Sequence, residues 1–381
     1  MVAGLKSNLS LTRRRPDFYL LGAFFLLLIV GLIFLWSASF PRAMKLYGDP
    51  FFYFKRQLQA FLFGVFAFGL SYALPVNRWR KLSTILFVFN IILLVLVLLP
   101  GLSLEAGGAR RWLRIGAFSF QPSELAKITL PLFVAERFSR INLSESDNLF
   151  KLPAEFYITS FWVFVMLVLV LLEPDMSTTV LLFSTFAMGI YIAGANPVAI
   201  VMMFFSMVPL VILALFGREY RVKRLHAFVD PLHDPWGTGY QIIQSKIAIA
   251  RGGLLGVGIG ASTQKISYLP AAHTDYIFSV IAEETGFVGA SIVIFLFLYI
   301  VYRGVRTGFR VVEKDFFSGI LAFLLTWEFA FQVLVNIQVA LGNLPPTGVT
   351  LPAVSYGRSS LIVTMAMMGL LFNISSLESA S

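Results

Sequence analysis

Cysteine is absent from this 381-residue sequence, and histidine is rare, with three in the whole chain. The lack of cysteine excludes disulfide bonds and thiolate metal sites. Three histidines argue against a histidine-rich metal centre. Charge is also scarce, because Asp, Glu, Lys and Arg make up 13% of the residues, about half of the usual share in soluble proteins. These absences exclude an ordinary water-soluble globular protein.

Apolar residues dominate what is present. They make up 58% of the chain, 39 of them are phenylalanine, and the mean hydropathy is +0.81. This composition is typical of a protein whose solvent is lipid. The first apolar run follows Arg13, Arg14 and Arg15 and has no small-residue cleavage site. We therefore expect it to span the membrane and not to be a cleaved signal peptide.

Apolar runs of about 17–25 residues, bounded by charge or by Pro and Gly, predict ten transmembrane helices. They cover residues 19–39, 56–74, 82–100, 122–139, 155–172, 177–194, 196–216, 275–302, 316–341 and 357–375. The fold class is thus an all-α polytopic membrane protein, with a long extracytoplasmic loop, residues 217–274, between helices 7 and 8. We expect residues 1–381 to form a single integral membrane domain.

An even number of spans places both termini on one side of the membrane. Basic residues of the short loops lie mostly on that side, and the positive-inside rule therefore predicts a cytoplasmic N-terminus, residues 1–18, and a cytoplasmic C-terminus, residues 376–381. The 217–274 loop still carries several basic residues, including Arg218, Arg221 and Arg224. Positive charge on the outer side suggests a site for an anionic ligand.

Two patterns stand out in the 217–274 loop. The pattern of apolar and polar residues at 240–249 predicts an amphipathic helix. Its polar face would carry Gln241, Gln244, Ser245 and Lys246. A glycine-rich run follows at residues 252–260. No predicted strand precedes this run, which excludes a dinucleotide fingerprint. Its glycines are expected to give flexibility or close backbone approach.

Asp275 lies where this loop enters the eighth predicted span. Ionisable residues at membrane depth are costly, and each is therefore a functional candidate. A structural alternative is that Thr274 or Asp275 caps the helix. The two interpretations are compatible, because a helix N-terminus would keep the carboxylate ionised and able to accept a proton.

Glu124, Lys127 and Asp175 form a second intramembrane ion group. Glu124 and Lys127 are one helical turn apart, and Asp175 starts the sixth span. A buried lysine with carboxylate partners is most simply a structural tie between helices. We therefore predict that this group orients the outer cavity.

Arg110, Arg111 and Trp112 precede the fourth span. Such residues commonly anchor a membrane protein among lipid headgroups. A diphosphate would be bound by the same guanidinium geometry, and both alternatives stay open. The proline-rich stretch 344–357 predicts only a rigid loop.

Together these stretches resemble the SEDS family (shape, elongation, division and sporulation) over nearly the whole chain. The residues that carry the resemblance lie at 36–39, 108–113, 121–124, 173–175, 234–236, 239–241, 264–265, 268–270, 273–275 and 345–360. The Asp-Pro-Trp and Gly-Tyr-Gln pieces, with residues 49–57, are more similar to the cell-division branch (FtsW-like) than to the elongation branch (RodA-like). Family members usually have two glycines after Ser-Tyr, whereas this chain has Gly357 followed by Arg358.

The resemblance implies a peptidoglycan glycosyltransferase that polymerises lipid II, a disaccharide-pentapeptide on undecaprenyl diphosphate. The family's essential acid falls on Asp275, which would act as the catalytic base. The expected substrate-binding residues are Arg110, Arg111, Trp112, Lys246, Lys265, His273, Thr274 and Ser355. A divalent cation, Mg²⁺ or Mn²⁺, is the one expected cofactor.

The resemblance also implies partners and a location. The partners are a class B penicillin-binding protein transpeptidase and other divisome or elongasome membrane proteins, and not nucleic acid. The location is the bacterial cytoplasmic (inner) membrane. Two other functions stay open from the residues alone: a flippase for lipid-linked precursors, whose path the intramembrane ions would line, and a scaffold without activity.

Overall fold

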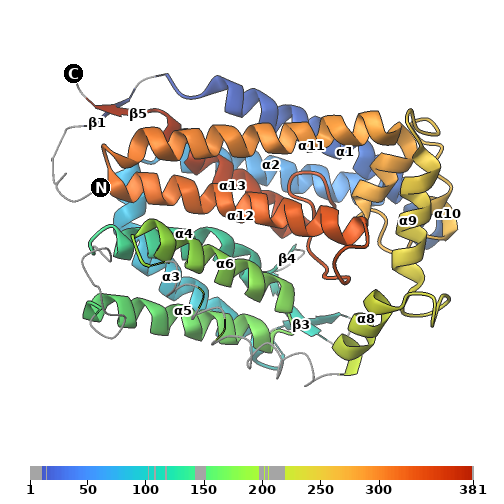
Figure 1. Ribbon diagram of the computed structural model, residues 1–381, viewed down its shortest axis with the longest axis horizontal. Coiled ribbons are helices and arrows are strands. Elements are labelled where there is room, and N and C mark those ends of the chain that lie inside the picture. Colours follow the sequence, from blue (N-terminus) through green and yellow to red (C-terminus); the bar gives the residue numbers. More distant parts are fainter. Residues whose placement is uncertain are drawn as a thin grey trace.

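The computed structural model describes residues 11–13, 15–101, 103–106, 109–115, 118–141, 152–196, 201, 205 and 219–379. Within these residues, nine long helices lie side by side along one axis (Figure 1). They are α1 (Phe18–Tyr47), α2 (Phe52–Ala73), α3 (Val76–Leu98), α4 (Pro122–Phe138), α5 (Ala154–Leu172), α6 (Met176–Ile192), α11 (Ile277–Val312), α12 (Phe316–Ala340) and α13 (Arg358–Ser375). Nine of the ten predicted spans are thus confirmed as helices. The predicted seventh span, 196–216, lies almost wholly outside the described residues.

The local sequence sets where several of these helices begin and end. Asp17 caps α1 by accepting a hydrogen bond from the backbone of Leu20, and Asp315 caps α12 in the same way. The prediction ended the first helix at residue 39, but α1 continues to Tyr47. Gly48 then ends it in the left-handed conformation that glycine adopts without strain. Polar residues after position 39 were therefore a poor guide to the helix end.

Helix α13 lies in the interior of the helix bundle. In α13, 83% of the most apolar stretch is buried, against 28% in α3 and in α5, so α13 lies inside the bundle and the other two face outward. Helix α13 packs closely against α2, where a Cβ at Gly369 would collide with the backbone of Phe68. Small residues at such contacts let transmembrane helices approach.

Both chain ends lie at one end of the bundle, which we call the terminal end (Figure 1). There β1 (Leu11–Arg13) pairs antiparallel with β5 (Leu377–Ser379). Arg303 also forms an ion pair with Asp17 at 2.6 Å. The described segments nearest the two termini thus lie together, and which side of the membrane they face stays a prediction.

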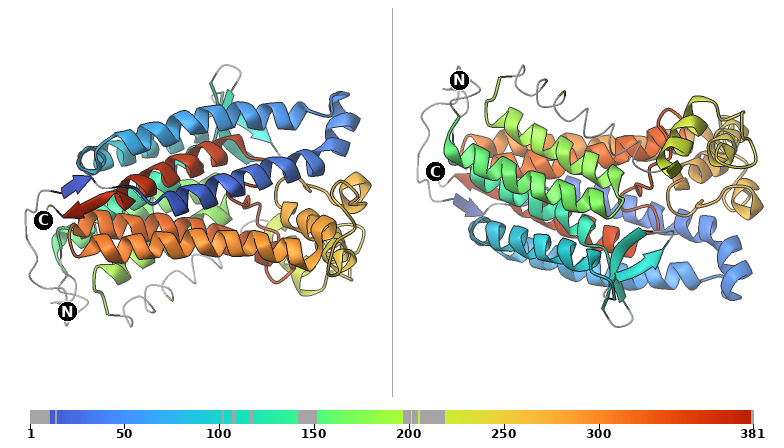
Figure 2. Two further views of the ribbon diagram at one scale, coloured as in Figure 1. Left: turned by 90° about the horizontal axis from the view of Figure 1, so that it is seen from above. Right: turned by 90° about the horizontal axis from the view of Figure 1, so that it is seen from below.

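The opposite end, which we call the loop end, carries the shorter elements (Figures 1 and 2). These are α8 (Glu219–Val229), α9 (Tyr240–Gly252), α10 (Gln264–Ser267) and a three-stranded sheet of β2 (Ser103–Ala106), β3 (Ala109–Ile115) and β4 (Phe118–Phe120). The sheet was not predicted, because its strands are too short for their periodicity to show. The predicted amphipathic helix is confirmed as α9. The prediction of its polar face is partly wrong, because Ser245 is buried, as are Ile242 and Ala248.

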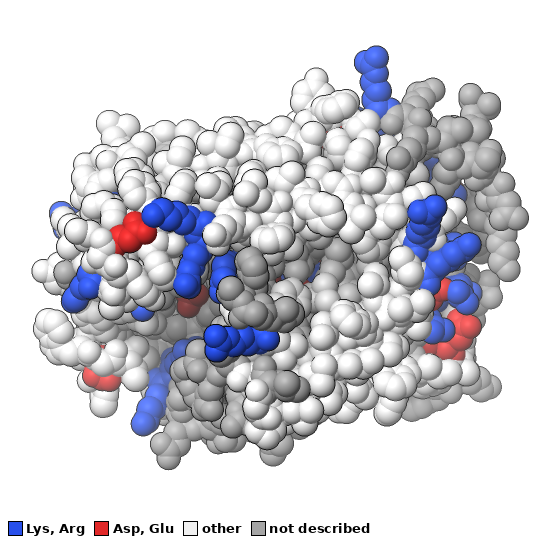
Figure 3. All heavy atoms as spheres, turned by 180° about the vertical axis from the view of Figure 1, so that it is seen from behind, with Lys and Arg blue, Asp and Glu red and all other residues white. Residues whose placement is uncertain are grey.

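The surface matches a membrane environment. Six of the described helices are long and apolar enough to span a membrane, and α6 is apolar but shorter. Large apolar side chains of the bundle are exposed, among them Phe63 and Phe66 of α2 and Phe295 of α11. Figure 3 shows Lys and Arg gathered mainly toward the two ends, with a broad uncharged surface between them. The chain is an integral membrane protein.

Candidate functional site

A cavity of about 330 Å³ lies at the loop end. Its walls come from β3 and β4, the first turns of α4 and α6, the segment before α11, and the loop between α12 and α13. The lining residues are Arg111, Trp112, Ser119, Gln121, Glu124, Lys127, Asp175, Thr178, Leu181, Thr274, Asp275, Gly348, Val349, Thr350, Tyr356, Gly357, Arg358, Ser359 and Ser360. The cavity thus brings together Asp275, the predicted ion group and part of the predicted binding set.

Asp275 reaches this cavity from the segment that precedes α11. The predicted capping role is wrong, because Tyr276 occupies the N-cap position and no side chain caps the helix. The Thr274 hydroxyl instead donates to the carbonyl of Ala271. The Asp275 side chain is therefore not needed to hold the helix end, and the residue lines the cavity.

Burial has a large effect on the ionisation of Asp275. It raises the pKa of this carboxyl from 3.8 to about 6, while the positive charges of Arg224 and Arg111 act in the opposite direction. The sequence predicted that the helix N-terminus would keep the group firmly ionised. In the structure burial acts against ionisation and raises the pKa without making the group neutral at pH 7. A carboxylate with this pKa is ionised at neutral pH and is a stronger base than an exposed aspartate.

Helix α12 carries a polar ladder that sequence reasoning missed. Glu328, Gln332 and Asn336 recur every fourth residue and are buried. The Asn336 amide donates to the carbonyl of Asp275 at 3.0 Å and to that of Val349 at 2.7 Å. It thus ties the backbone beside the candidate base to the α12–α13 loop. The signal was available, since polar residues with a period of four in an apolar 25-residue helix mark an inward face.

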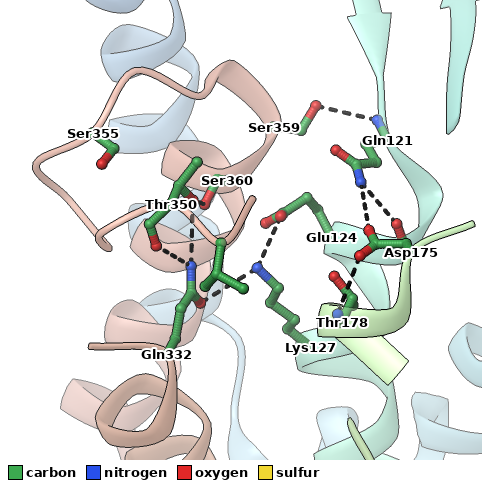
Figure 4. Close-up of polar contacts among 12 residues, drawn as sticks. Gln121, Glu124, Lys127, Asp175, Thr178, Gln332, Thr350, Ser355, Ser359 and Ser360 are labelled. Carbon is green, nitrogen blue, oxygen red and sulfur yellow. Dashed lines mark hydrogen bonds and ion pairs between the residues drawn. The ribbon is translucent and has the colours of Figure 1, made fainter. Parts of the chain in front are cut away.

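The predicted pair of Glu124 and Lys127 forms in the structure. The Lys127 Nζ lies 2.8 Å from Glu124 Oε1 and 3.3 Å from Gln332 Oε1. Gln332 in turn donates to the carbonyl of Thr350 at 2.9 Å. Figure 4 shows Lys127 between Glu124 and Gln332. One buried lysine therefore connects α4, α12 and the loop before α13.

Asp175, the third predicted member, does not pair with this lysine. It caps α6 through the backbone of Thr178 and accepts a hydrogen bond from the Gln121 amide at 3.2 Å (Figure 4). Burial, with the negative charge of Asp175, raises the pKa of the nearby Glu173 to about 9. Glu173 is therefore neutral at pH 7.

Arg111 and Trp112 both line the cavity, as predicted. The Arg111 Nε donates to the carbonyl of Glu173 at 3.0 Å, and a terminal nitrogen donates to the carbonyl of Pro174. These bonds fix the guanidinium without neutralising it, because carbonyls carry no net charge. Arg110 lies on β3, but its side chain is outside the described residues.

Arg358 supplies a second guanidinium to the cavity wall. It is the first residue of α13 and donates to the Ser119 hydroxyl at 2.7 Å. The next residue, Ser359, accepts a hydrogen bond from the backbone of Gln121 (Figure 4). The departure from the family pattern at position 358 thus adds a cation to the cavity.

His273 and Ser355 support the site from behind the wall. His273 is buried against the rings of Tyr53 and Tyr356. Burial, helped by Arg42, lowers its pKa to about 4, so it is neutral at pH 7. The Ser355 hydroxyl donates to the carbonyl of Thr274 at 2.6 Å. Of the predicted 273–275 stretch, Thr274 and Asp275 line the cavity and His273 does not.

The structure does not bring Lys246 or Lys265 to the cavity. Lys246 is exposed on α9. Lys265 is buried in an ion pair with Glu284 at 2.6 Å and also donates to Ser37. Its charge is therefore already compensated. Among the described residues, the cations that line the cavity are Arg111, Lys127 and Arg358.

The arrangement can promote transfer of a group from an anionic leaving group. One carboxylate with a raised pKa can accept a proton from a hydroxyl. The two guanidinium groups of residues that line the cavity can stabilise charge that develops on a phosphate. In the described part of the chain, no three His, Cys, Asp or Glu side chains come together as a metal site.

Comparisons with known proteins agree with this fold. Residues 18–380 match the FtsW/RodA/SpoVE family, described as a cell cycle protein. The chain is 38% identical to the probable peptidoglycan glycosyltransferase FtsW of Aliivibrio salmonicida, covering 91% of this chain and 86% of that one. It is 36% identical to the stage V sporulation protein E of Bacillus subtilis, covering 94% and 97%.

Solved structures give the same result. A chain from a study titled "Structural coordination of polymerization and crosslinking by a peptidoglycan synthase complex" matches with a TM-score of 0.78 and 29% identity, over 94% of this chain and 97% of that one. The rod shape determining protein RodA of Thermus thermophilus matches with a TM-score of 0.68 and 25% identity, over 94% and 96%. The resemblance to the SEDS family is confirmed, and the chain belongs to the family of FtsW, RodA and SpoVE.

Proposed function

We propose that this chain is a peptidoglycan glycosyltransferase that polymerises lipid II into glycan strands at the outer face of the cytoplasmic membrane, for septal or lateral cell-wall synthesis. The observation that carries the proposal is the cavity that holds Asp275 together with Arg111 and Arg358. Relatives named peptidoglycan glycosyltransferase cover most of the chain, which supports the same activity.

The chemistry follows from the cavity. The 4-hydroxyl of an acceptor lipid II attacks the anomeric carbon of the growing strand, and Asp275 accepts the hydroxyl proton. A new glycosidic bond forms while the bond between the anomeric carbon and the diphosphate oxygen breaks with inversion. The electron pair leaves on undecaprenyl diphosphate. Arg111 and Arg358 stabilise that charge, because both residues line the same cavity as Asp275.

The structure changes which basic residues are assigned to the leaving group. Lys246 and Lys265 were candidates from the sequence, but neither lines the cavity. A divalent cation stays a prediction, and the described side chains do not fit a metal site made by protein alone. The proposed mechanism therefore contains no step that requires a divalent cation.

Polymerisation by the purified chain tests the proposal. The protein, with and without a cognate class B penicillin-binding protein, is incubated with lipid II, and the products are separated on a gel. We expect a ladder of glycan strands, which a flippase or a scaffold would not make. Failure to form strands under both conditions, by a protein that remains folded, would contradict the proposal.

Location and partners form part of the same proposal. We infer that both termini, which lie together, are cytoplasmic, because the basic residues of the short loops favour that side. A class B penicillin-binding protein would supply crosslinking. The similarity to a chain from a peptidoglycan synthase complex supports this partner. Other divisome or elongasome proteins stay predictions.

The raised pKa of Asp275 predicts an acid limb in the pH profile, that is, a polymerisation rate that falls toward acid pH. A general base must be deprotonated, so polymerisation should fall as the pH drops through about 6, by about tenfold for each further pH unit. His273, with a pKa of about 4, contributes little above pH 5. The measurement is the initial rate between pH 5 and 8, with melting temperatures at each pH as the control. A flat rate over this range would argue against Asp275 as the base.

Asn336 is predicted to be a positioning residue. Asn336→Ala removes the hydrogen bonds to the carbonyls of Asp275 and Val349, so both carbonyls lose that donor. Leaving a buried polar group without its partner costs about 1–3 kcal/mol of stability. We expect a lower kcat and a shifted midpoint of the acid limb, because the carboxylate is no longer held in place.

The matched control is Asn343→Ala, because Asn343 is exposed and its amide donates to Gln338. This control variant should leave kcat and the pH midpoint of the acid limb unchanged. If Asn336→Ala lowers only the melting temperature and keeps the pH midpoint, the residue has a structural role alone.

A further inference from the structure

The glycine-rich segment 252–262 fills a break in α11. At Gly286 the helix backbone turns to φ 67° and ψ −168°, so regular hydrogen bonding is interrupted. The segment replaces the missing partners: Phe287 and Val288 donate to the carbonyls of Gly253 and Leu254, and the carbonyls of Glu283 and Glu284 accept from residues 257 and 258. A Cβ at Gly256 or Gly286 would collide with the facing backbone. This close approach explains the glycines.

One side of the segment is held by buried polar groups. The Ser262 hydroxyl donates to Glu283, and the backbone of Thr263 donates to the same carboxylate at 3.3 Å. Lys265 pairs with Glu284 at 2.6 Å, and that carboxylate also accepts from Ser37 of α1 at 2.8 Å. The segment is therefore fixed against α11 and α1 and is not a loose loop.

The other side of the segment is apolar and exposed. Leu254, Leu255 and Ile259 are 72%, 82% and 69% exposed. No charged residue occurs between Arg251 and Lys265. Exposed leucine and isoleucine without nearby charge are unfavourable in water.

Leu254, Leu255 and Ile259 continue the exposed apolar face of α11. The segment is hydrogen bonded to Phe287 and Val288 of α11, which are 67% and 48% exposed. Ile292, Phe295 and Leu298 extend the same exposed apolar face along the helix. Because the backbone groups at the break are satisfied internally, the segment can enter an apolar phase without leaving them unpaired.

We propose that segment 252–262 is inserted into the membrane, with Leu254, Leu255 and Ile259 among the lipids of the leaflet at the loop end. The lipid bilayer covers this apolar side of the segment. The inserted segment anchors the loop that runs on to Asp275 at a fixed depth, through the buried ties to α11. This inference does not depend on the proposed activity.

Cysteine labelling tests the insertion, and the chain offers a background free of native cysteine. Leu255→Cys and Ile259→Cys are made one at a time in the full chain, labelled with an environment-sensitive nitrobenzoxadiazole dye, and reconstituted into phospholipid liposomes with or without doxyl-labelled phospholipid. Phe295→Cys, on the lipid-facing side of α11, is the positive control. His233→Cys, exposed in the loop between α8 and α9, is the negative control.

We expect loss of dye emission in the presence of doxyl lipid at positions 255 and 259, as at 295, and no loss at 233. Unlabelled Leu255→Cys in liposomes should also resist a membrane-impermeant maleimide that modifies His233→Cys. Rapid maleimide modification at both 255 and 259 would overturn the proposal. Protection from maleimide without quenching by doxyl lipid would overturn it as well, because protein would then cover the segment. Melting temperatures show that each variant is folded.

Discussion

Asp275→Asn is expected to abolish nearly all glycan polymerisation while leaving the protein folded. The carboxylate lines the cavity, and burial raises its pKa to about 6, which suits a general base at neutral pH. Loss of such a base typically costs ~10²–10⁴ in rate. Asparagine has nearly the same shape but cannot accept the proton. The measurement is strand formation from lipid II by the purified variant, with its melting temperature.

The matched control for this variant is Asp230→Asn. Asp230 is exposed at the same end of the molecule, and its side chain accepts a hydrogen bond from the backbone of Leu232, which an amide oxygen can also do. Its activity should be unchanged. Full activity of folded Asp275→Asn would show that another group accepts the proton, and the mechanism would have to be abandoned.

Lys127→Met is expected to cause the largest loss of stability. The side chains of Lys127 and Glu124 are 4% and 11% exposed, and their ion pair is 2.8 Å long. Lys127 bonds Oε1 of Glu124, and Oε2 has no hydrogen-bond partner among the described residues, so the variant leaves a buried carboxylate uncompensated. Breaking such a pair from one side costs about 3–5 kcal/mol. We expect a much lower melting temperature in detergent and loss of polymerisation, because α4, α12 and the loop before α13 lose their common tie.

A double variant and a surface pair separate charge from packing. Lys127→Met combined with Glu124→Gln removes both charges and should recover most of the melting temperature without recovering activity. Lys55→Met breaks a pair of similar length with Asp49, but those side chains are 64% and 38% exposed. It should change stability little, because exposed pairs contribute little. Equal effects of Lys127→Met and Lys55→Met would contradict the buried-tie interpretation.

Several site residues could be predicted from the sequence because their chemistry is conspicuous in an apolar chain. Asp275, Glu124, Lys127 and Asp175 were all identified, and all line one cavity. Asn336 and Gln332 were missed, although their spacing along α12 was visible. Attention to charge alone overlooked neutral amides, which carry much of the hydrogen bonding around the cavity.

Other assignments required the tertiary structure. Lys265 and Arg111 look alike in the sequence as cations of predicted outer segments. The structure pairs Lys265 with Glu284, whereas Arg111 is held by the uncharged carbonyls of Glu173 and Pro174 and keeps its charge for the cavity. The partners of these cations come from other segments of the chain, and their identity depends on how the helices pack.

The sequence by itself located nine of the long helices of the bundle and singled out Asp275 as the candidate catalytic acid. Each helix in lipid must satisfy its own backbone hydrogen bonds, and local hydropathy is therefore sufficient to locate it. The tertiary structure alone decided which cations face Asp275, where the glycine-rich segment docks and how Asn336 holds the site. These contacts join residues tens to hundreds of positions apart, and they form only when side chains of separate helices pack together.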